Sequence, residues 1–317
     1  MASFYGVSGR NLQSQYKDFL SGFKAWDQKA HAKKWLVFPK NIGKRLSIDE
    51  TSLSNGELYT ILTNKSGKGR KGTIVAMVAG TKAEVVIAVI EKIPLKERNL
   101  VKEITLDMAG NMGLIAKKCF ANATRVTDRF HVQKLAIEAL QEIRIKYRWQ
   151  AIDLENEAME RARKSNMNFK SSILPNGDTI KQLLARSRYF LYKNKSKWTP
   201  NQTQRAVLLI ELYPDIQKGY SLTQELRGIF ENTKDKILGF AKLAKWHEKV
   251  NQSGFKSFNT ISRTIINHYQ TILNYFDNRS TNASAESFNA KIKAFKSQFR
   301  GVRNVEFFLF RLTNIYA

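Results

Sequence analysis

Residues 45–128 alternate short apolar runs with turn signals, a pattern that predicts strands rather than one long helix. Three runs rich in Val, Ile, Leu, Tyr and Thr are separated by Asn55-Gly56 and by a polar loop, so they should form an antiparallel meander. Helical stretches accompany two later runs, which predicts crossover helices and parallel strands. We therefore expect a mixed α/β sheet in the order βββαβαβ, with strands at 45–52, 57–64, 72–79, 101–108 and 123–128 and helices at 82–93 and 110–120.

The remaining sequence carries apolar residues at three- and four-residue spacing, which predicts helices. Between residues 131 and 276 the strand signal is absent, and breakers such as Pro175-Asn176-Gly177 and Pro214 separate the helical segments. The first 44 residues are also expected to be mostly helical and basic. The helices expected after the sheet are 131–164, 178–192, 200–213, 221–246, 255–276, 283–300 and 305–316.

Charge is the most unusual property of the composition. The 317 residues include 53 Lys and Arg but only 27 Asp and Glu, a formal net charge of +26. Such a charge favours a polyanionic partner, with nucleic acid as the first hypothesis and an acidic membrane surface as the second. The single Cys119 excludes an internal disulfide or a cysteine-based zinc site and favours a reducing compartment. No apolar run reaches the ~18 residues of a spanning helix, so we expect a soluble cytoplasmic protein without a membrane partner.

Three carboxylates stand out by their positions. Asp49 lies inside the first expected strand, Asp107 ends the fourth, and Glu286 lies in the first turn of a late helix. The first and fourth strands should be neighbours, so Asp49 and Asp107 should lie side by side. Close carboxylates are costly unless they are paired or hold a cation, and oxygen ligands suit Mg²⁺. The alternatives are unrelated acidic residues and a strand-end Asp that only forms a turn.

The late helix separates its polar and apolar residues. At 100° per residue the apolar side chains cluster on the face opposite to Glu286. They are Phe288, Ile292, Phe295 and Phe299, whereas the Glu286 face carries Asn289, Lys293 and Arg300. A carboxylate beside an amide and two cations fits a metal ligand next to a phosphate backbone, although an ordinary solvated face has the same pattern.

Four motifs in this order resemble the DDE transposases of bacterial insertion sequences. They are SIDET around Asp49, TLDMAGNM around Asp107, DRFHVQKL at 128–135 and NASAESFNAKIKAFK at 282–296. Residues 198–227 and the tail GVRNVEFFLFRL at 301–312 share the likeness, which covers roughly residues 45–317. The resemblance implies an RNase H-like core interrupted by a long all-helical insertion. The implied segments are a helical lead-in at 1–44, core at 45–133, insertion at 134–276 and core helices at 277–317.

The resemblance also implies roles for individual residues. Asp49, Asp107 and Glu286 match the acidic triad, which would bind two Mg²⁺ ions, with Mn²⁺ as a substitute. Asp128 and His131 match a signature near the active site. The implied DNA contacts are Asn289 and Lys293, with Arg300 beside them on the same helix and Arg129 and Lys291 as weaker candidates.

The implied activity is DNA cleavage at the ends of a mobile element followed by strand transfer into target DNA. Double-stranded DNA would be the substrate, a homodimer the active complex, and the bacterial nucleoid the location. Relatives usually carry a zinc-binding and helix-turn-helix region ahead of the core, and only about 44 residues precede the first expected strand here. A separate polypeptide is therefore one expectation for end recognition. Alternatives are an RNase H-like nuclease or resolvase without strand joining, and a non-catalytic DNA-binding derivative.

Overall fold

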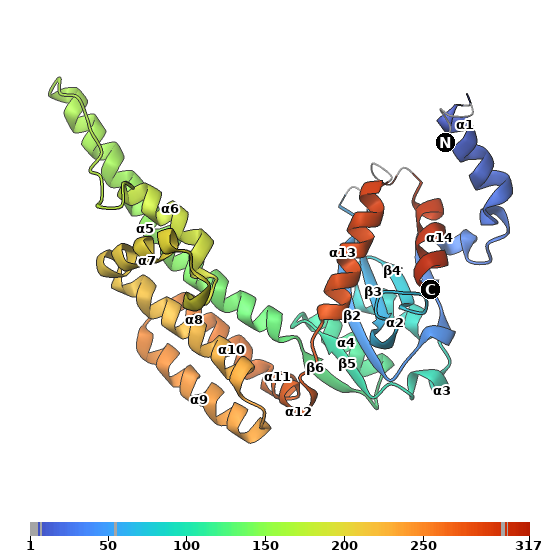
Figure 1. Ribbon diagram of the computed structural model, residues 1–317. Coiled ribbons are helices and arrows are strands. Elements are labelled where there is room, and N and C mark those ends of the chain that lie inside the picture. The colour runs from blue at the N-terminus through green and yellow to red at the C-terminus, as the bar shows by residue number, and fades with distance from the viewer. Residues whose placement is uncertain (1–5, 7, 54–55, 299–301, 303) are drawn as a thin grey trace. The chain divides into compact units, whose positions relative to one another are not determined.

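A computed structural model describes residues 6, 8–53, 56–298, 302 and 304–317 (Figure 1). The chain divides into two compact units. The core unit comprises residues 1–128 and 279–317, and the helical unit comprises residues 129–278. Among the described residues, no helix is long and apolar enough to cross a membrane.

The core unit is built on one six-stranded sheet in the order β1-β4-β3-β2-β5-β6. Neighbours β1–β4, β4–β3 and β3–β2 are antiparallel, whereas β2–β5 and β5–β6 are parallel, so the predicted meander and the predicted parallel strands are confirmed. The strands are β1 (Trp35–Val37), β2 (Arg45–Ser52), β3 (Leu58–Asn64), β4 (Ile74–Ala79), β5 (Glu103–Leu106) and β6 (Thr124–Thr127).

Strand β1 is a correction to the helical expectation for the first 44 residues. It is only three residues long and pairs Leu36 with Met77 at the edge of the sheet, so no alternation long enough to be recognised precedes it. Short helical pieces surround it, and this segment belongs to the core unit. They are α1 (Gly9–Gln15), the π-helical η1 (Tyr16–Leu20) and the 3-10 turns η2 (Phe23–Ala25), η3 (Lys29–His31) and η4 (Pro39–Asn41).

Two apolar cores cover the two faces of the sheet. On one face Ile48 and Ile104 pack with α2 (Ala83–Ile90) and α4 (Gly110–Cys119). On the other, Ile61 and Met77 pack with apolar residues of the two C-terminal helices. These helices are α13 (Ala283–Gln298) and α14 (Val305–Tyr316), and a short α3 (Leu95–Arg98) and the 3-10 turn η5 (Lys65–Gly67) complete the unit.

The predicted apolar stripe of α13 is confirmed for three of its four members. Phe288, Ile292 and Phe295 are buried in the second core, and the ring of Phe295 lies 5.3 Å from that of Phe308 on α14. Phe299 lies outside the described residues. Because this face packs on the sheet, the opposite face of α13 is left for polar residues.

The helical unit consists of helices, as the sequence predicts, with a longer irregular connection at 165–179. The single helix predicted over 255–276 is wrong, because the chain turns at His268 and at Asn274. The helices are α5 (Arg129–Lys164), α6 (Ile180–Leu191), α7 (Pro200–Leu212), α8 (Pro214–Asn232), α9 (Lys236–Ser253), α10 (Lys256–Asn267), α11 (Tyr269–Leu273) and α12 (Tyr275–Asn278), with a 3-10 turn η6 (Lys195–Lys197). The single helix predicted over 221–246 is wrong. The chain breaks there between α8 and α9, because Asp235 caps α9 by accepting a hydrogen bond from the Leu238 N–H at 2.7 Å.

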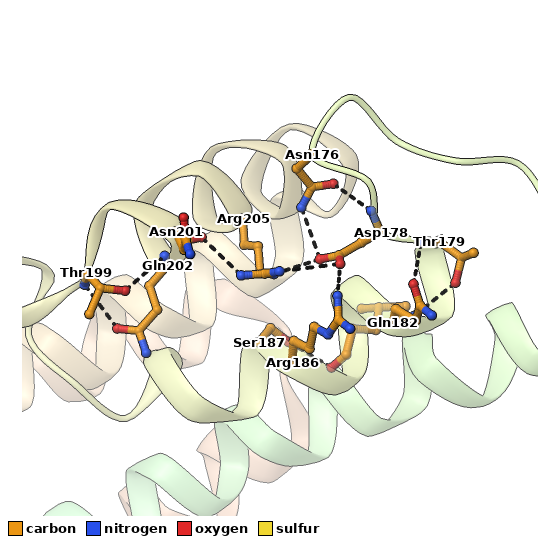
Figure 2. A network of polar contacts seen from close by, with 11 residues as sticks. Asn176, Asp178, Thr179, Gln182, Arg186, Ser187, Thr199, Asn201, Gln202 and Arg205 are labelled. Carbon is orange, nitrogen blue, oxygen red and sulfur yellow. Dashed lines mark hydrogen bonds and ion pairs between the residues drawn. The ribbon is translucent and has the colours of Figure 1, made fainter.

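A buried carboxylate links the first helices of this unit (Figure 2). Asp178 is only 1% exposed, accepts a hydrogen bond from Arg205 Nε at 2.7 Å, and is ion-paired with Arg186. The next residue, Thr179, begins α6 with a capping box that it shares with Gln182. The loop before α6 is thereby held against α7.

Candidate active site

The predicted carboxylates lie along one row of the sheet. Strands β2 and β5 pair Ser47 with Thr105, so the same register two residues further on sets Asp49 opposite Asp107. Strands β5 and β6 pair Leu106 with Thr127, and one residue further on Asp107 is opposite Asp128. Asp107 and Asp128 thus directly follow the ends of β5 and β6, and β5 is the parallel neighbour of the strand that contains Asp49.

Asp49 faces the layer that contains α13. Its antiparallel partner Ile61 belongs to the same apolar core as Phe288, whereas Ile48 belongs to the opposite core. Asn289 confirms this orientation, because its Nδ2 donates a hydrogen bond to Asp49 Oδ2 at 2.8 Å and to the Glu50 carbonyl at 3.3 Å. The other carboxylate oxygen, Asp49 Oδ1, accepts a hydrogen bond from the Glu50 N–H at 2.8 Å. Both oxygens of Asp49 are thus held in place.

A buried asparagine fixes the start of α13 beside Asp49. The Asn282 side chain donates to the carbonyl of Ile48, the residue before Asp49, at 3.3 Å. The Asn282 carbonyl in turn accepts the Glu286 N–H at 3.0 Å. Glu286 therefore lies in the first turn of α13, exposed, with a carboxylate oxygen within 4.8 Å of one from the buried Asp128.

Asp107 sits at a turn between β5 and α4. Its Oδ1 accepts a hydrogen bond from the Ala109 N–H at 2.9 Å, so the turn-forming role considered for this residue is real. The charge of Asp107 also affects the pKa of Glu50. Burial raises the pKa of Glu50, the neighbouring Asp107 raises it further, and a hydrogen bond with Asn111 opposes the rise. The raised pKa of Glu50 therefore reports negative charge from Asp107, and less strongly from Asp49, close to its carboxyl group.

A largely buried lysine, Lys65, contacts strand β5, and the sequence did not predict this contact. Lys65 Nζ donates to Glu103 Oε1 at 3.4 Å and to Ser280 Oγ at 3.0 Å, and it also bonds Thr105. Burial lowers the pKa of Lys65, which the charge of Glu103 partly offsets. Ser280 hydrogen-bonds Glu103 as well. The cluster ties the segment that leads into α13 to strand β5, and no local sequence pattern signals such long-range contacts.

The other predicted residues are placed as follows. Lys293 is exposed on α13, and Lys291 donates a hydrogen bond to the Gly69 carbonyl at 2.7 Å. Arg129 and His131 lie in the first turn of α5, at the start of the helical unit, where the Arg129 guanidinium is 5.8 Å from the centre of the Tyr275 ring. Arg300 lies outside the described residues.

The donor set suits a hard divalent cation. The acidic residues of the sheet region and of α13 provide carboxylate oxygens, which are the ligands that Mg²⁺ and Mn²⁺ prefer. Such a concentration of negative charge is favourable when a cation neutralises it. Among the described core-unit residues, Asp128 and Glu286 are a pair whose carboxylate oxygens lie close enough together, within 4.8 Å, to share a cation.

Comparison with known proteins agrees with this geometry. A model of the ISL3 family of DDE transposases, described as transposase, matches residues 46–312. The transposase for insertion sequence element IS1001 of Bordetella parapertussis is 22% identical over 271 residues, which cover 84% of this chain and 59% of that relative. The chain thus spans about three fifths of the length of this relative. Because the family match covers most of the sequence and includes all three carboxylates, the chain belongs to the DDE transposases of insertion sequences.

Proposed function

We propose that this chain is the catalytic chain of a transposase, which hydrolyses a phosphodiester at an element end and joins the freed 3′-hydroxyl to target DNA. The observation that supports this best is the parallel pairing of β2, which contains Asp49, with β5, which ends just before Asp107, together with the hydrogen bond from α13 to Asp49. Family membership supports the same reaction class.

The proposed cofactor is a pair of Mg²⁺ ions, for which Mn²⁺ can substitute. Asp49 and Asp107 would be shared ligands, and Glu286 would hold the second ion. Ions bound there would activate first water and then the 3′-hydroxyl, and would stabilise the leaving oxygen. Asp128 is proposed as an accessory group, because its carboxylate lies close to that of Glu286.

The protein residues orient the ligands and the DNA. Asn289 donates a hydrogen bond to Asp49 Oδ2 and so fixes the direction of the carboxylate. Lys293 lies two turns after Glu286 on the same face and is exposed, which supports a contact with a DNA phosphate. Contacts from Arg129, His131, Lys291 and Arg300 to DNA remain proposals from the family resemblance.

The proposed substrate is double-stranded DNA, both at the element ends and at the target. A net charge of +26 supports this partner, since neutralising phosphates releases counterions. Because an element has two ends, we propose two copies of the chain in the active complex. A DNA substrate also implies the bacterial cytoplasm and its nucleoid.

Strand joining separates the transposase from a nuclease on the same fold. The test incubates the chain with a duplex that carries a pre-cleaved 3′-hydroxyl end, a supercoiled plasmid and Mg²⁺ or Mn²⁺. A transposase produces plasmid covalently joined to the duplex. Nicked plasmid without joined duplex would favour the nuclease, and DNA binding with neither product would favour a non-catalytic derivative.

A further inference from the structure

The helical unit contains a buried arginine that is bonded to neutral groups. Arg144 of α5 is 4% exposed; its Nε donates to Gln141 Oε1 at 2.6 Å and its Nη1 donates to the Leu184 carbonyl of α6 at 2.8 Å. A buried charge is costly unless an opposite charge compensates it. Neither Gln141 nor the Leu184 carbonyl carries one.

Two further arginines lie next to Arg144. Arg148 is one turn along α5, and Arg188 is one turn along α6 from the carbonyl that Arg144 binds. Burial, and then the positive charges of Arg148 and Arg188, lower the pKa of Arg144. Like charges four residues apart on one helix destabilise it, so Arg144 and Arg148 lie next to each other at a cost.

The neighbouring basic residues on α6 are neutralised. Lys181 is ion-paired with Glu155, and Arg186 with Asp178, as Figure 2 shows for the second pair. Within the part of the chain that the structure describes, no carboxylate forms an ion pair with Arg144, Arg148 or Arg188. Among the described residues, the three arginines therefore carry positive charge without an ion-pair partner on two helices, α5 and α6, that pack against each other (Figure 1 shows the two helices).

We propose that the exposed Arg148 and Arg188, backed by the buried Arg144, form a binding site for two neighbouring backbone phosphates of duplex DNA on the helical unit. The inference rests on the proposed function only in taking DNA as the substrate. Guanidinium groups bind phosphate oxygens in pairs, and Arg144 is already fixed by its two hydrogen bonds. Arg148 and Arg188 are exposed, so their guanidinium groups are accessible to a phosphate.

The test measures binding of the full chain to a duplex of arbitrary sequence, with EDTA present, as a function of salt concentration. The variant Arg148→Gln/Arg188→Gln removes the two exposed charges. The control Lys146→Gln/Lys245→Gln removes the same charge from exposed positions. Lys146 lies two residues from both Arg144 and Arg148, hence roughly 160° around α5 from each.

We expect the arginine variant to bind about tenfold more weakly at 0.1 M salt and to lower the slope of log K against log salt by about 1.8, since each neutralised phosphate contributes about 0.9. The control should keep the slope of the unmodified chain. Equal losses in both variants would overturn the proposal, because they would mean that only overall charge matters.

Unchanged unfolding temperatures will show that both double variants fold. If the double arginine variant does not fold, the single variant Arg148→Gln should lower the slope by about 0.9. An unchanged slope in that single variant would also overturn the proposal. The assay contains no metal and measures DNA binding, not cleavage or joining. Its result is therefore independent of the strand-joining result, and failure of this proposal can be distinguished from failure of the proposed function.

Discussion

Asn289 Nδ2 donates a 2.8 Å hydrogen bond to Asp49 Oδ2, and so joins helix α13 to the second strand of the sheet. The two residues are 240 positions apart, with the entire helical unit between them in the sequence. The same helix carries Glu286 in its first turn. This bond therefore fixes the part of the chain that follows the helical unit against the part that precedes it.

Replacing Asn289 should impair strand cleavage without unfolding the chain. Hydrogen bonds to charged groups contribute about 1.5–3 kcal/mol, so Asn289→Ala should slow cleavage roughly tenfold to a hundredfold. Asn289→Asp should be worse at neutral pH, because its carboxylate cannot donate this hydrogen bond and places a second negative charge beside Asp49. The control is Gln298→Ala, an exposed residue of the same helix. Unchanged cleavage in Asn289→Asp would remove the positioning role.

The two faces of α13 should respond differently to truncation. Phe295→Ala removes a buried aromatic and should lower the free energy of unfolding by about 3–5 kcal/mol. Lys293→Ala removes an exposed charge and should leave that free energy within about 0.5 kcal/mol while weakening DNA binding or strand transfer. Urea unfolding and gel-shift titration measure the two effects. Exchanged phenotypes would mean that the helix is rotated from its position in the structure.

Asp178 should make the helical unit sensitive to acid. Burial alone would raise the pKa of Asp178, but Arg205 and Arg186 hold it below the ordinary value of 3.8. The stabilisation is therefore present above about pH 4 and is lost as the pH falls through the lowered pKa. Urea midpoints between pH 7 and pH 2 should fall more steeply for the unmodified chain than for Asp178→Asn. The exposed Asp153→Asn serves as control, and equal slopes for both variants would contradict the prediction.

Cys119 should be protected from alkylation in the folded chain. It is buried on α4, and burial raises the pKa of its thiol to about 11. Because the thiolate is the reactive form, iodoacetamide at pH 8 should modify it very slowly, and rapidly once urea unfolds the core unit. Mass spectrometry measures the modified fraction. Fast labelling without urea would mean that the α4 face of the core is open.

The sequence was sufficient to predict that the strand containing Asp49 is the neighbour of the strand that leads to Asp107, because crossover helices determine which strands are neighbours. It was also sufficient for the apolar face of α13, since helical periodicity assigns Phe288 and Phe295 to one side. It could not provide the partner of Asn289 or the Lys65–Glu103 pair. Those contacts join residues distant in sequence and depend on tertiary packing.

Two errors in the expected elements have local causes. Strand β1 is only three residues long, so its sequence contains no recognisable alternation. It forms by pairing with β4. The break between α8 and α9 relies on the Asp235 cap rather than on Gly or Pro. A prediction based on the spacing of apolar residues does not detect such a cap.

Cleavage by carboxylate variants tests the central claim most directly. Asp49→Asn, Asp107→Asn and Glu286→Gln are assayed for cleavage of an end-containing duplex in Mg²⁺ and in Mn²⁺, and for DNA binding in EDTA on the same preparations. We predict that each variant loses cleavage in both metals and binds DNA within about twofold of the unmodified chain, since binding energy comes mainly from basic residues. The exposed Glu57→Gln should retain both activities. Retained cleavage in any of the three variants would contradict the assignment of that carboxylate to the active site.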